Sequence, residues 1–352
     1  MAYSTINKSS EFYKTKLYSG NNSTNAITGL DFSPNMVMIK KRNSAGGDYL
    51  VADTVRGADK DVRTNNNAAE MDNGAIHLNS FDSNGFTVGG TGGHSNASGS
   101  TYCSWSWKAG TTSGIATDSE TDITPTAYSF NQTSGVSIVK YTGTGTSGEG
   151  VPHGLGKKPQ FFMVKRLDTT GSWQVFWQPD INTSNATKYL ILNSTGIGGT
   201  NNNRWNGWQP DTYNFYLGNS TEVNASGGTY VAYVFANITG FSKLGNYKGG
   251  TNTFVYTGFK PKFILGRETS ASNGYNWHLF TPEILGRFEP SNTTAEYTDY
   301  LRVVDWNSNG FRWGTTLNNW DNSDGREYMY MAFGQTMVGS NNVPCAAGST
   351  DG

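Results

Sequence analysis

The chain has 352 residues, more than the roughly 250–300 at which a single hydrophobic core usually divides, so we expect more than one domain. Charged residues make up 15 % of the sequence and the formal net charge is −1, which excludes a long-range field that would attract nucleic acid or an anionic membrane. The sequence contains no run of about 18 apolar residues and no basic-then-apolar leader after Met1, so we expect neither a membrane span nor a secretory signal.

The composition favours strands and turns over helices. Aromatic residues reach 13 %, and 44 glycines accompany many Asn, Ser and Thr residues, which suit pleated sheets and tight turns better than helix surfaces. The two cysteines, Cys103 and Cys345, lie far apart in the sequence. We therefore expect no disulfide framework, and Cys103, in an apolar run, is predicted to be a buried thiol.

Four landmarks recur three times in the same order and predict a repeated β unit. The first is a tyrosine followed two residues later by a glycine, at Tyr18, Tyr141 and Tyr247. The second is a proline that opens an apolar run ending in a basic residue, at 34–40, 159–165 and 261–267. The third is a phenylalanine after glycine or asparagine, at Phe86, Phe215 and Phe311. The fourth is a tyrosine-led aromatic strand, at 102–107, 230–235 and 328–333.

The landmark strands also predict which side chains are buried. Along the fourth landmark, alternate side chains are apolar in every copy, and most of the others are small. We expect the apolar face to line the core of its domain, which leaves the other face to pack on a neighbouring domain. Met36, Phe161 and Phe263, two residues after each proline, are predicted at equivalent buried positions.

The proline-opened run is apolar on both faces, which indicates either a central strand between two layers or a strand under a long loop. A glycine-containing turn then leads into a second aromatic strand, which predicts a β-hairpin in every copy. The predicted fold class is therefore all-β, with three tandem β-sandwich-like domains that share one repeated unit. The predicted divisions are a first repeat at 1–108, a Gly/Thr/Ser-rich linker and leading strand at 109–138, a second repeat at 139–245, a third repeat at 246–336 and a C-terminal tail at 337–352.

A basic residue lies six positions after the proline in every copy, at Lys40, Lys165 and Arg267. A charge at the end of a buried strand needs a partner, so we expect a side-chain hydrogen bond to an acidic group or a carbonyl oxygen in at least two copies. We interpret these residues as a repeated structural position.

Tryptophans crowd the second and third repeats, at Trp173, Trp177, Trp205, Trp208, Trp306, Trp313 and Trp320. Exposed tryptophans flanked by amides are typical of carbohydrate-binding surfaces, so these residues are candidate contacts for carbohydrate or for a partner protein. The alternative is that the rings pack inside or between domains, as large rings usually do.

The sequence predicts no catalytic residue, no metal site and no cofactor. The histidines are His77, His94, His153 and His278, and none lies at ligand spacing from a cysteine or a second histidine. No Ser, Cys or Asp arrangement accompanies His153, so we expect no nucleophilic triad. Polysaccharide cleavage would require two carboxylates across a cleft, and no pattern in the sequence singles out such a pair.

Several motifs carry a further resemblance. The segments 153–156, 163–166, 224–230 and 254–261, with the ending 341–345, together resemble a repeated domain of uncharacterised function in marine bacteriophages. That domain is common in tail-fibre-like and other virion structural proteins of cyanophages and related phages. The resemblance implies a component of the phage particle, and it supplies no binding residues.

We therefore expect a non-catalytic virion structural protein, a tail-fibre or receptor-contacting surface component made in the host cytoplasm and released by lysis. One alternative is a capsid-attached fibre or decoration protein, and a second is a carbohydrate-binding or polysaccharide-degrading protein. The expected partners are other virion proteins, further copies of the chain in a homo-oligomer, with a trimer as one candidate, and host surface polysaccharide. Nucleic-acid binding and membrane insertion are not expected.

Overall fold

The structure, a computed structural model, describes residues 4–74, 76–177, 187–196, 198–270, 275–284, 286–291, 304–313 and 322–335. Within these ranges the chain is almost entirely antiparallel β-structure, which confirms the predicted all-β class. The helical elements described are one 3-10 turn, η1 (Ser9–Glu11), and two four-residue helices, α1 (Asn202–Trp205) and α2 (Thr221–Asn224). No helix in the described part of the chain is long and apolar enough to span a membrane.

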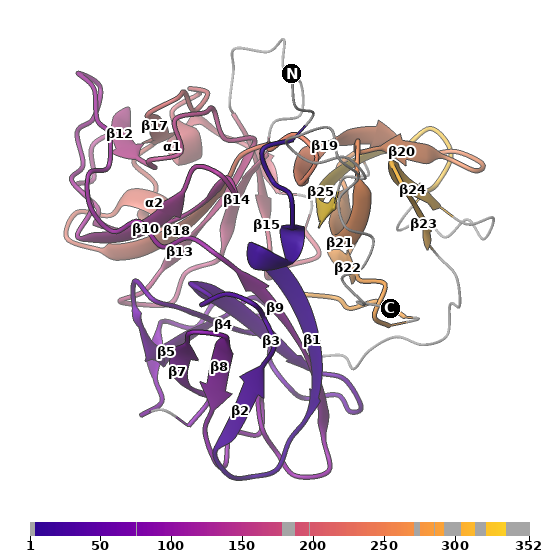
Figure 1. Cartoon of the computed structure of the whole chain (residues 1–352). Helices are drawn as coiled ribbons and strands as arrows, with labels where there is room; N and C mark the ends of the chain where they lie inside the picture. The colour runs from indigo at the N-terminus through magenta and orange to yellow at the C-terminus, as the bar shows by residue number, and fades with distance from the viewer. Residues whose placement is uncertain are drawn as a thin grey trace.

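The strands form three lobes, each with a large sheet and a small sheet (Figure 1). The first lobe has a large sheet of β1 (Tyr13–Ser19), β9 (Thr101–Trp107), β3 (Met36–Lys41), β4 (Leu50–Asp53), β5 (Gly57–Arg63) and β6 (Met71–Asp72). Its small sheet contains β2 (Asn25–Thr28), β8 (Gly85–Val88) and β7 (Leu78–Asp82).

The second and third lobes have related sheets. The large sheet of the second lobe contains β10 (Ala127–Asn131), β11 (Val136–Thr142), β18 (Thr229–Phe235), β13 (Phe161–Arg166), β14 (Gln174–Trp177), β15 (Lys188–Ile191) and β16 (Gly199–Thr200), and its small sheet β12 (Glu149–Pro152) and β17 (Asn214–Leu217). The large sheet of the third lobe contains β19 (Ser242–Lys248), β25 (Glu327–Gln335), β21 (Lys260–Glu268) and β22 (His278–Phe280), and its small sheet β20 (Phe254–Tyr256), β24 (Gly310–Trp313) and β23 (Val304–Asn307).

The four sequence landmarks occupy matching places in the three lobes. The large sheets contain the orders β1-β9-β3-β4, β11-β18-β13-β14 and β19-β25-β21-β22, so the proline-opened run lies centrally, between the tyrosine-led strand and its hairpin partner. Met36, Phe161 and Phe263 are buried, and they pair with Trp107, Phe235 and Phe333 on the neighbouring strand.

The prolines obey the limits of strand geometry. Pro34 and Pro159 precede their strands, where no ladder hydrogen bond is lost. Pro261 lies inside β21, next to a register shift between Pro261 and Phe263. A β-bulge is the other place where a sheet accepts proline, because the pairing is already interrupted there.

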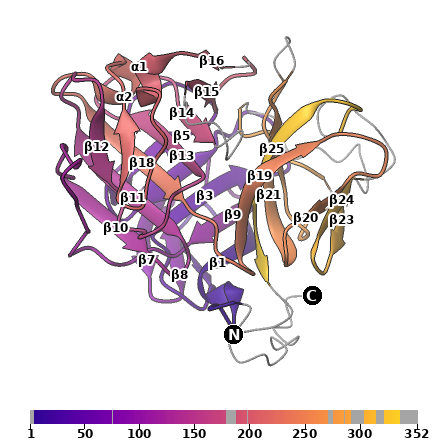
Figure 2. The same ribbon diagram turned by 90° about the horizontal axis from the view of Figure 1, so that it is seen from above.

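Each large sheet is a middle layer with a different core on each face. One face packs on the small sheet of its own lobe, as Tyr230, Ala232 and Val234 do against Phe215 and Leu217. The opposite faces of all three large sheets meet in a single cluster, here called the shared core, whose tyrosine-led strands contribute Cys103, Trp105, Trp107, Val231, Tyr233, Phe235, Met329, Met331 and Phe333. Figure 2 shows the three lobes grouped around this interior.

This arrangement corrects the expected roles of the two strand faces. The apolar face of the fourth landmark faces the other lobes, and the opposite face lies in the core of its own lobe. The size of the two spaces explains why the large side chains face the other lobes. Three large sheets that meet around one centre leave a wide space that large rings fill, whereas each small sheet lies close to its large sheet. The proposed domain boundaries stay predictions, since side chains of every lobe belong to the shared core.

The segment predicted as a linker packs on the second lobe. β10 pairs with β11 and extends the large sheet, and Thr111 and Thr121 form β-bridges with Phe130 and Gly150. Ile123 is buried in the core of that lobe. Residues 109–126, here called the strap, therefore bring polar side chains onto the small sheet of the second lobe.

Candidate functional site

The structure decides between the two interpretations of the tryptophans. Four of the candidates, Trp173, Trp177, Trp205 and Trp313, are at most 5 % exposed. They line hydrophobic cores, so their assignment as surface contacts is wrong and the packing alternative holds. Trp306 is half-buried against the core of the third lobe, and Trp320 lies outside the described residues. Trp208 is 48 % exposed and is the candidate whose ring is open to solvent.

Buried rings at the start of the second hairpin strand interlock the lobes. Trp173 Nε1 donates to the carbonyl oxygen of Arg63 in the first lobe at 2.7 Å. Trp277 Nε1 donates to the carbonyl oxygen of Ile191 in the second lobe at 2.9 Å. Tyr49, at the same place in the first lobe, packs edge-to-face on Phe288 of the third. Each lobe thus reaches into a different neighbour, which closes a ring of three contacts around the shared core.

The repeated basic residues are buried and bonded to carbonyl oxygens. Lys40 donates to Gly47, Lys165 donates to Gly171 at 2.9 Å, and Arg267 donates to Ile191 at 2.9 Å. Burial lowers the pKa of Lys40 and of Lys165 to about 8, and that of Arg267 to about 10. In the first two lobes the position anchors the turn of its own hairpin. In the third lobe the longer guanidinium also reaches Ser194, Thr195 and Gly196 of the second lobe.

A buried ion pair joins the first and second lobes. Arg56 Nε and the Tyr233 hydroxyl each donate to Asp53 Oδ2 at 2.6 Å, and Arg56 Nη2 contacts the same hydroxyl at 3.1 Å. The side chains of Arg56 and Asp53 are fully buried. Glu70 Oε2, 3.2 Å from Arg56 Nη1, is a second carboxylate partner of the guanidinium. Asp53 depends on Arg56, because without it the carboxylate would be an uncompensated buried charge.

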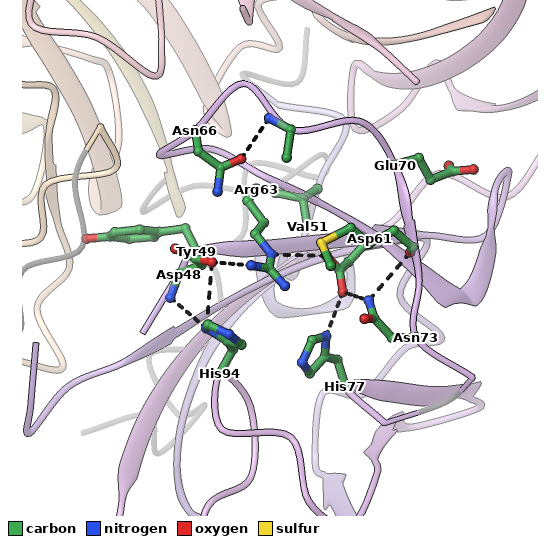
Figure 3. A network of polar contacts seen from close by, with 12 residues as sticks. Asp48, Tyr49, Val51, Asp61, Arg63, Asn66, Glu70, Asn73, His77 and His94 are labelled. Atoms are coloured by element: carbon green, nitrogen blue, oxygen red, sulfur yellow. Dashed lines mark hydrogen bonds and ion pairs between the residues drawn. The ribbon is translucent and has the colours of Figure 1, made fainter. Parts of the chain in front are cut away.

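The tertiary structure brings together two histidines that are distant in the sequence (Figure 3). The rings of His77 and His94 lie 5.4 Å apart. His77 Nδ1 lies 2.6 Å from Asp61 Oδ2, and His94 Nδ1 accepts the backbone N–H of Asp48 at 2.8 Å. Arg63 lies between the two carboxylates, bonded to Asp48 and 3.6 Å from Asp61.

The charged side chains of this network pair with one another. Because His94 Nδ1 accepts a hydrogen bond from the backbone, it carries no proton in this arrangement, and the ring proton lies on Nε2. Burial, followed by the positive charge of Arg63, lowers the pKa of His94. No group of three or more His, Cys, Asp or Glu residues suited to a metal ion occurs among the residues that the structure describes. The network therefore ties β5 to the residues that directly precede β4 and β7 and to the loop that carries His94.

The exposed Trp208 belongs to a rigid loop of the second lobe. Its ring meets Tyr216 edge-to-face at 5.2 Å and lies beside Gly148, where an added Cβ would come within 3.6 Å of Cη2. Asp211 Oδ1 accepts the backbone N–H groups of Tyr213 and Asn214, both at 2.7 Å, which closes the turn. Tyr213 is 41 % exposed, so this loop contains two exposed aromatic side chains.

Two carboxylates lie beside Tyr216, the ring that Trp208 meets. The Tyr216 hydroxyl lies 2.7 Å from Glu120 Oε2 of the strap and 2.5 Å from Asp211 Oδ2. Burial and these two carboxylates raise the pKa of Tyr216, so its proton is retained. Burial alone would raise the pKa of Asp211, but the hydrogen bonds from Tyr216 and from two backbone N–H groups outweigh it, and the net pKa is lowered. Asp211 is therefore ionised at neutral pH.

His153 supports the loop from below. It is fully buried, its Nδ1 accepts the Leu155 N–H at 3.1 Å, and its Nε2 lies 3.3 Å from the Asp211 carbonyl oxygen. The backbone N–H of His153 donates to the Tyr213 carbonyl oxygen at 2.9 Å. Sequence reasoning treated His153 as a loop residue and missed Glu120, Asp211 and Tyr213. The available signal was the Pro210–Asp211 turn directly after Trp208.

The fold and its interior define the class of protein: an all-β protein of three related sheet pairs locked around one aromatic core. The family described as a domain of unknown function (DUF7483) matches residues 8–336, so the chain belongs to this family. The match spans all three lobes. A comparison with curated proteins gives no match.

Proposed function

We propose that this protein is a non-catalytic structural component of a bacteriophage virion, of the tail-fibre or receptor-contacting kind. The observation that carries the proposal is the shared core, because a ring of interlobe contacts around it joins the three lobes and leaves loops outside for contact. Rigid presentation of a surface suits a particle component. The phage-type motifs in the sequence direct the proposal to a virion.

The polar clusters favour this proposal over an enzyme. Asp48 and Asp61 share Arg63, and Asp53 is neutralised by Arg56, so these carboxylates stabilise contacts within the protein. Glycoside hydrolysis would also require a carboxyl group with a raised pKa as the acid, whereas the pKa of Asp211, in the exposed loop, is lowered. Further copies of the chain and other virion proteins are the partners that this function requires.

Immunogold labelling of purified particles tests the proposal. Antibodies raised against the recombinant chain should label the tail or its fibres, and mass spectrometry of the same particles should detect the chain. Label on the head would replace the tail assignment with the alternative of a capsid-attached fibre or decoration protein. Absence of the chain from purified particles would overturn the virion proposal altogether.

A further inference from the structure

We propose that the Trp208 surface, defined as Trp208, Tyr213, Glu120 and Asp211, is a binding site for a neutral saccharide. The inference rests on the proposed receptor-contacting function for its biological role, but the binding itself is a property of the isolated chain. It assigns a chemical class of ligand to one place on the second lobe.

The exposure of Trp208 is the first step. Burying a large apolar side chain stabilises a fold by roughly 1.5–3 kcal/mol, and most tryptophans that the structure describes are buried. Trp208 is the most exposed of them, although its ring contacts Tyr216 and lies beside Gly148. A ring that is held in place and left open is suited to stacking on a ligand.

Order in the loop is the second step. Asn206 and Gly207 adopt left-handed backbone conformations, with φ of 53° and 74°, and the Trp208 N–H donates to the Trp205 carbonyl oxygen at 3.0 Å. Ser147 donates to Asn206 Oδ1 at 2.9 Å and joins the loop to its neighbour. The ring is therefore ordered before a ligand arrives, so binding loses little conformational entropy at this point.

The chemistry beside the rings indicates a polyhydroxyl ligand. Glu120 is exposed and Asp211 half-buried. The single hydroxyl proton of Tyr216 bonds to one of these carboxylates at a time, so both keep lone pairs for a ligand. Carboxylates bind sugar hydroxyls through charge-assisted hydrogen bonds, and an indole ring covers the apolar C–H face of a sugar. A saccharide presents both kinds of group on one small ring.

Local charge selects a neutral saccharide over an acidic one. The strap supplies Asp118 and Asp122 in addition to Glu120, and the loop supplies Asp211. Lys158 is a cation whose charge interacts with Asp211. The surroundings are therefore net negative, which repels uronic and sialic acids.

Affinity electrophoresis of the full-length chain tests the site. Each native gel contains one polysaccharide. Dextran, galactomannan and laminarin are neutral, and polygalacturonate and alginate are anionic. We expect at least one neutral polysaccharide to retard the wild type and neither anionic one to do so. Trp208→Ala should weaken the retardation about tenfold or more. Tyr256→Ala removes another exposed ring, on the third lobe, and should bind like the wild type.

Melting curves show that each variant is folded, and Tyr213→Ala provides a second variant from the same surface. Retention of binding in both Trp208→Ala and Tyr213→Ala would overturn the site, and so would equal loss in Tyr256→Ala. Retardation by the anionic polysaccharides alone, or by none of the five, would overturn the ligand class. These results are independent of the particle labelling, so either proposal can fail without the other.

Discussion

His153 should make the protein less stable as the pH falls from 7 to 5. Burial lowers the pKa of its imidazole from 6.5 to about 4. The folded-state pKa lies below the unfolded one, so between these values the unfolded chain binds a proton that the folded chain does not. The contribution of neutral His153 is therefore complete above pH 6.5 and is lost as the pH falls through about 4.

The size of the effect follows from the two pKa values. Each pKa unit corresponds to about 1.4 kcal/mol, so the complete loss is about 3 kcal/mol. About 2 kcal/mol of it falls between pH 7 and 5, where most carboxylates do not titrate. Urea unfolding followed by tryptophan fluorescence at the two pH values measures the difference.

His153→Gln provides the test. The glutamine amide can still donate to the Asp211 carbonyl oxygen but carries no titrating group, so the difference between pH 7 and 5 should shrink by about 2 kcal/mol. The unfolding free energy at pH 7 should itself fall by about 1 kcal/mol, because the Leu155 N–H loses its acceptor. His94→Gln is the comparison, and it should have a smaller effect because that side chain is 26 % exposed. The same pH dependence in His153→Gln and the wild type would refute the reasoning.

Three further substitutions test the contacts between and within lobes. Trp173→Phe should lower the unfolding free energy by about 2–3 kcal/mol, since it leaves a cavity and an unpaired Arg63 carbonyl. Trp306→Phe should lower it by under about 1 kcal/mol, and equal losses in urea unfolding would contradict this. Asp53→Asn should cost about 2–3 kcal/mol, because buried Arg56 loses its nearer carboxylate and keeps only Glu70 at 3.2 Å. Asp168→Asn, at a more exposed pair, should cost about 1 kcal/mol or less, and melting temperatures separate the two. The pKa of Lys165 is about 8 in the folded protein, below its unfolded value. The unfolding free energy of the wild type should therefore rise by about 2 kcal/mol between pH 8 and 10 because of this residue. A Lys165→Met variant that keeps this rise would disprove the assignment.

The local β-structure could be predicted from the sequence. Proline at a strand start, side chains that alternate with a period of two, and glycine turns are properties of neighbouring residues. They were sufficient to predict the central strands, the hairpins, and the equivalence of Met36, Phe161 and Phe263, which the strand pairing shows. The repeated basic position could also be recognised, because it follows each proline at one distance.

What covers each strand face was decided only by the tertiary structure. Alternation identifies an apolar face but not its neighbour, so the apolar face of the tyrosine-led strands was assigned to the domain core and in fact lies in the shared core. The same limit explains why most tryptophans proved buried. Burial depends on what packs against a ring. Trp173 and Trp177 are covered in the shared core, and Trp205 and Trp313 in the cores of their own lobes.

The polar sites depended on the tertiary structure for a related reason. His77 and His94 are brought together by the fold of the first lobe. Glu120 reaches the Tyr216 hydroxyl, which Asp211 also contacts, because the strap folds over the second lobe. The sequence by itself determined an all-β chain with three copies of one strand pattern. The shared core, the histidine network and the Trp208 surface depend on contacts between segments distant in sequence, and no periodicity along the chain records those contacts.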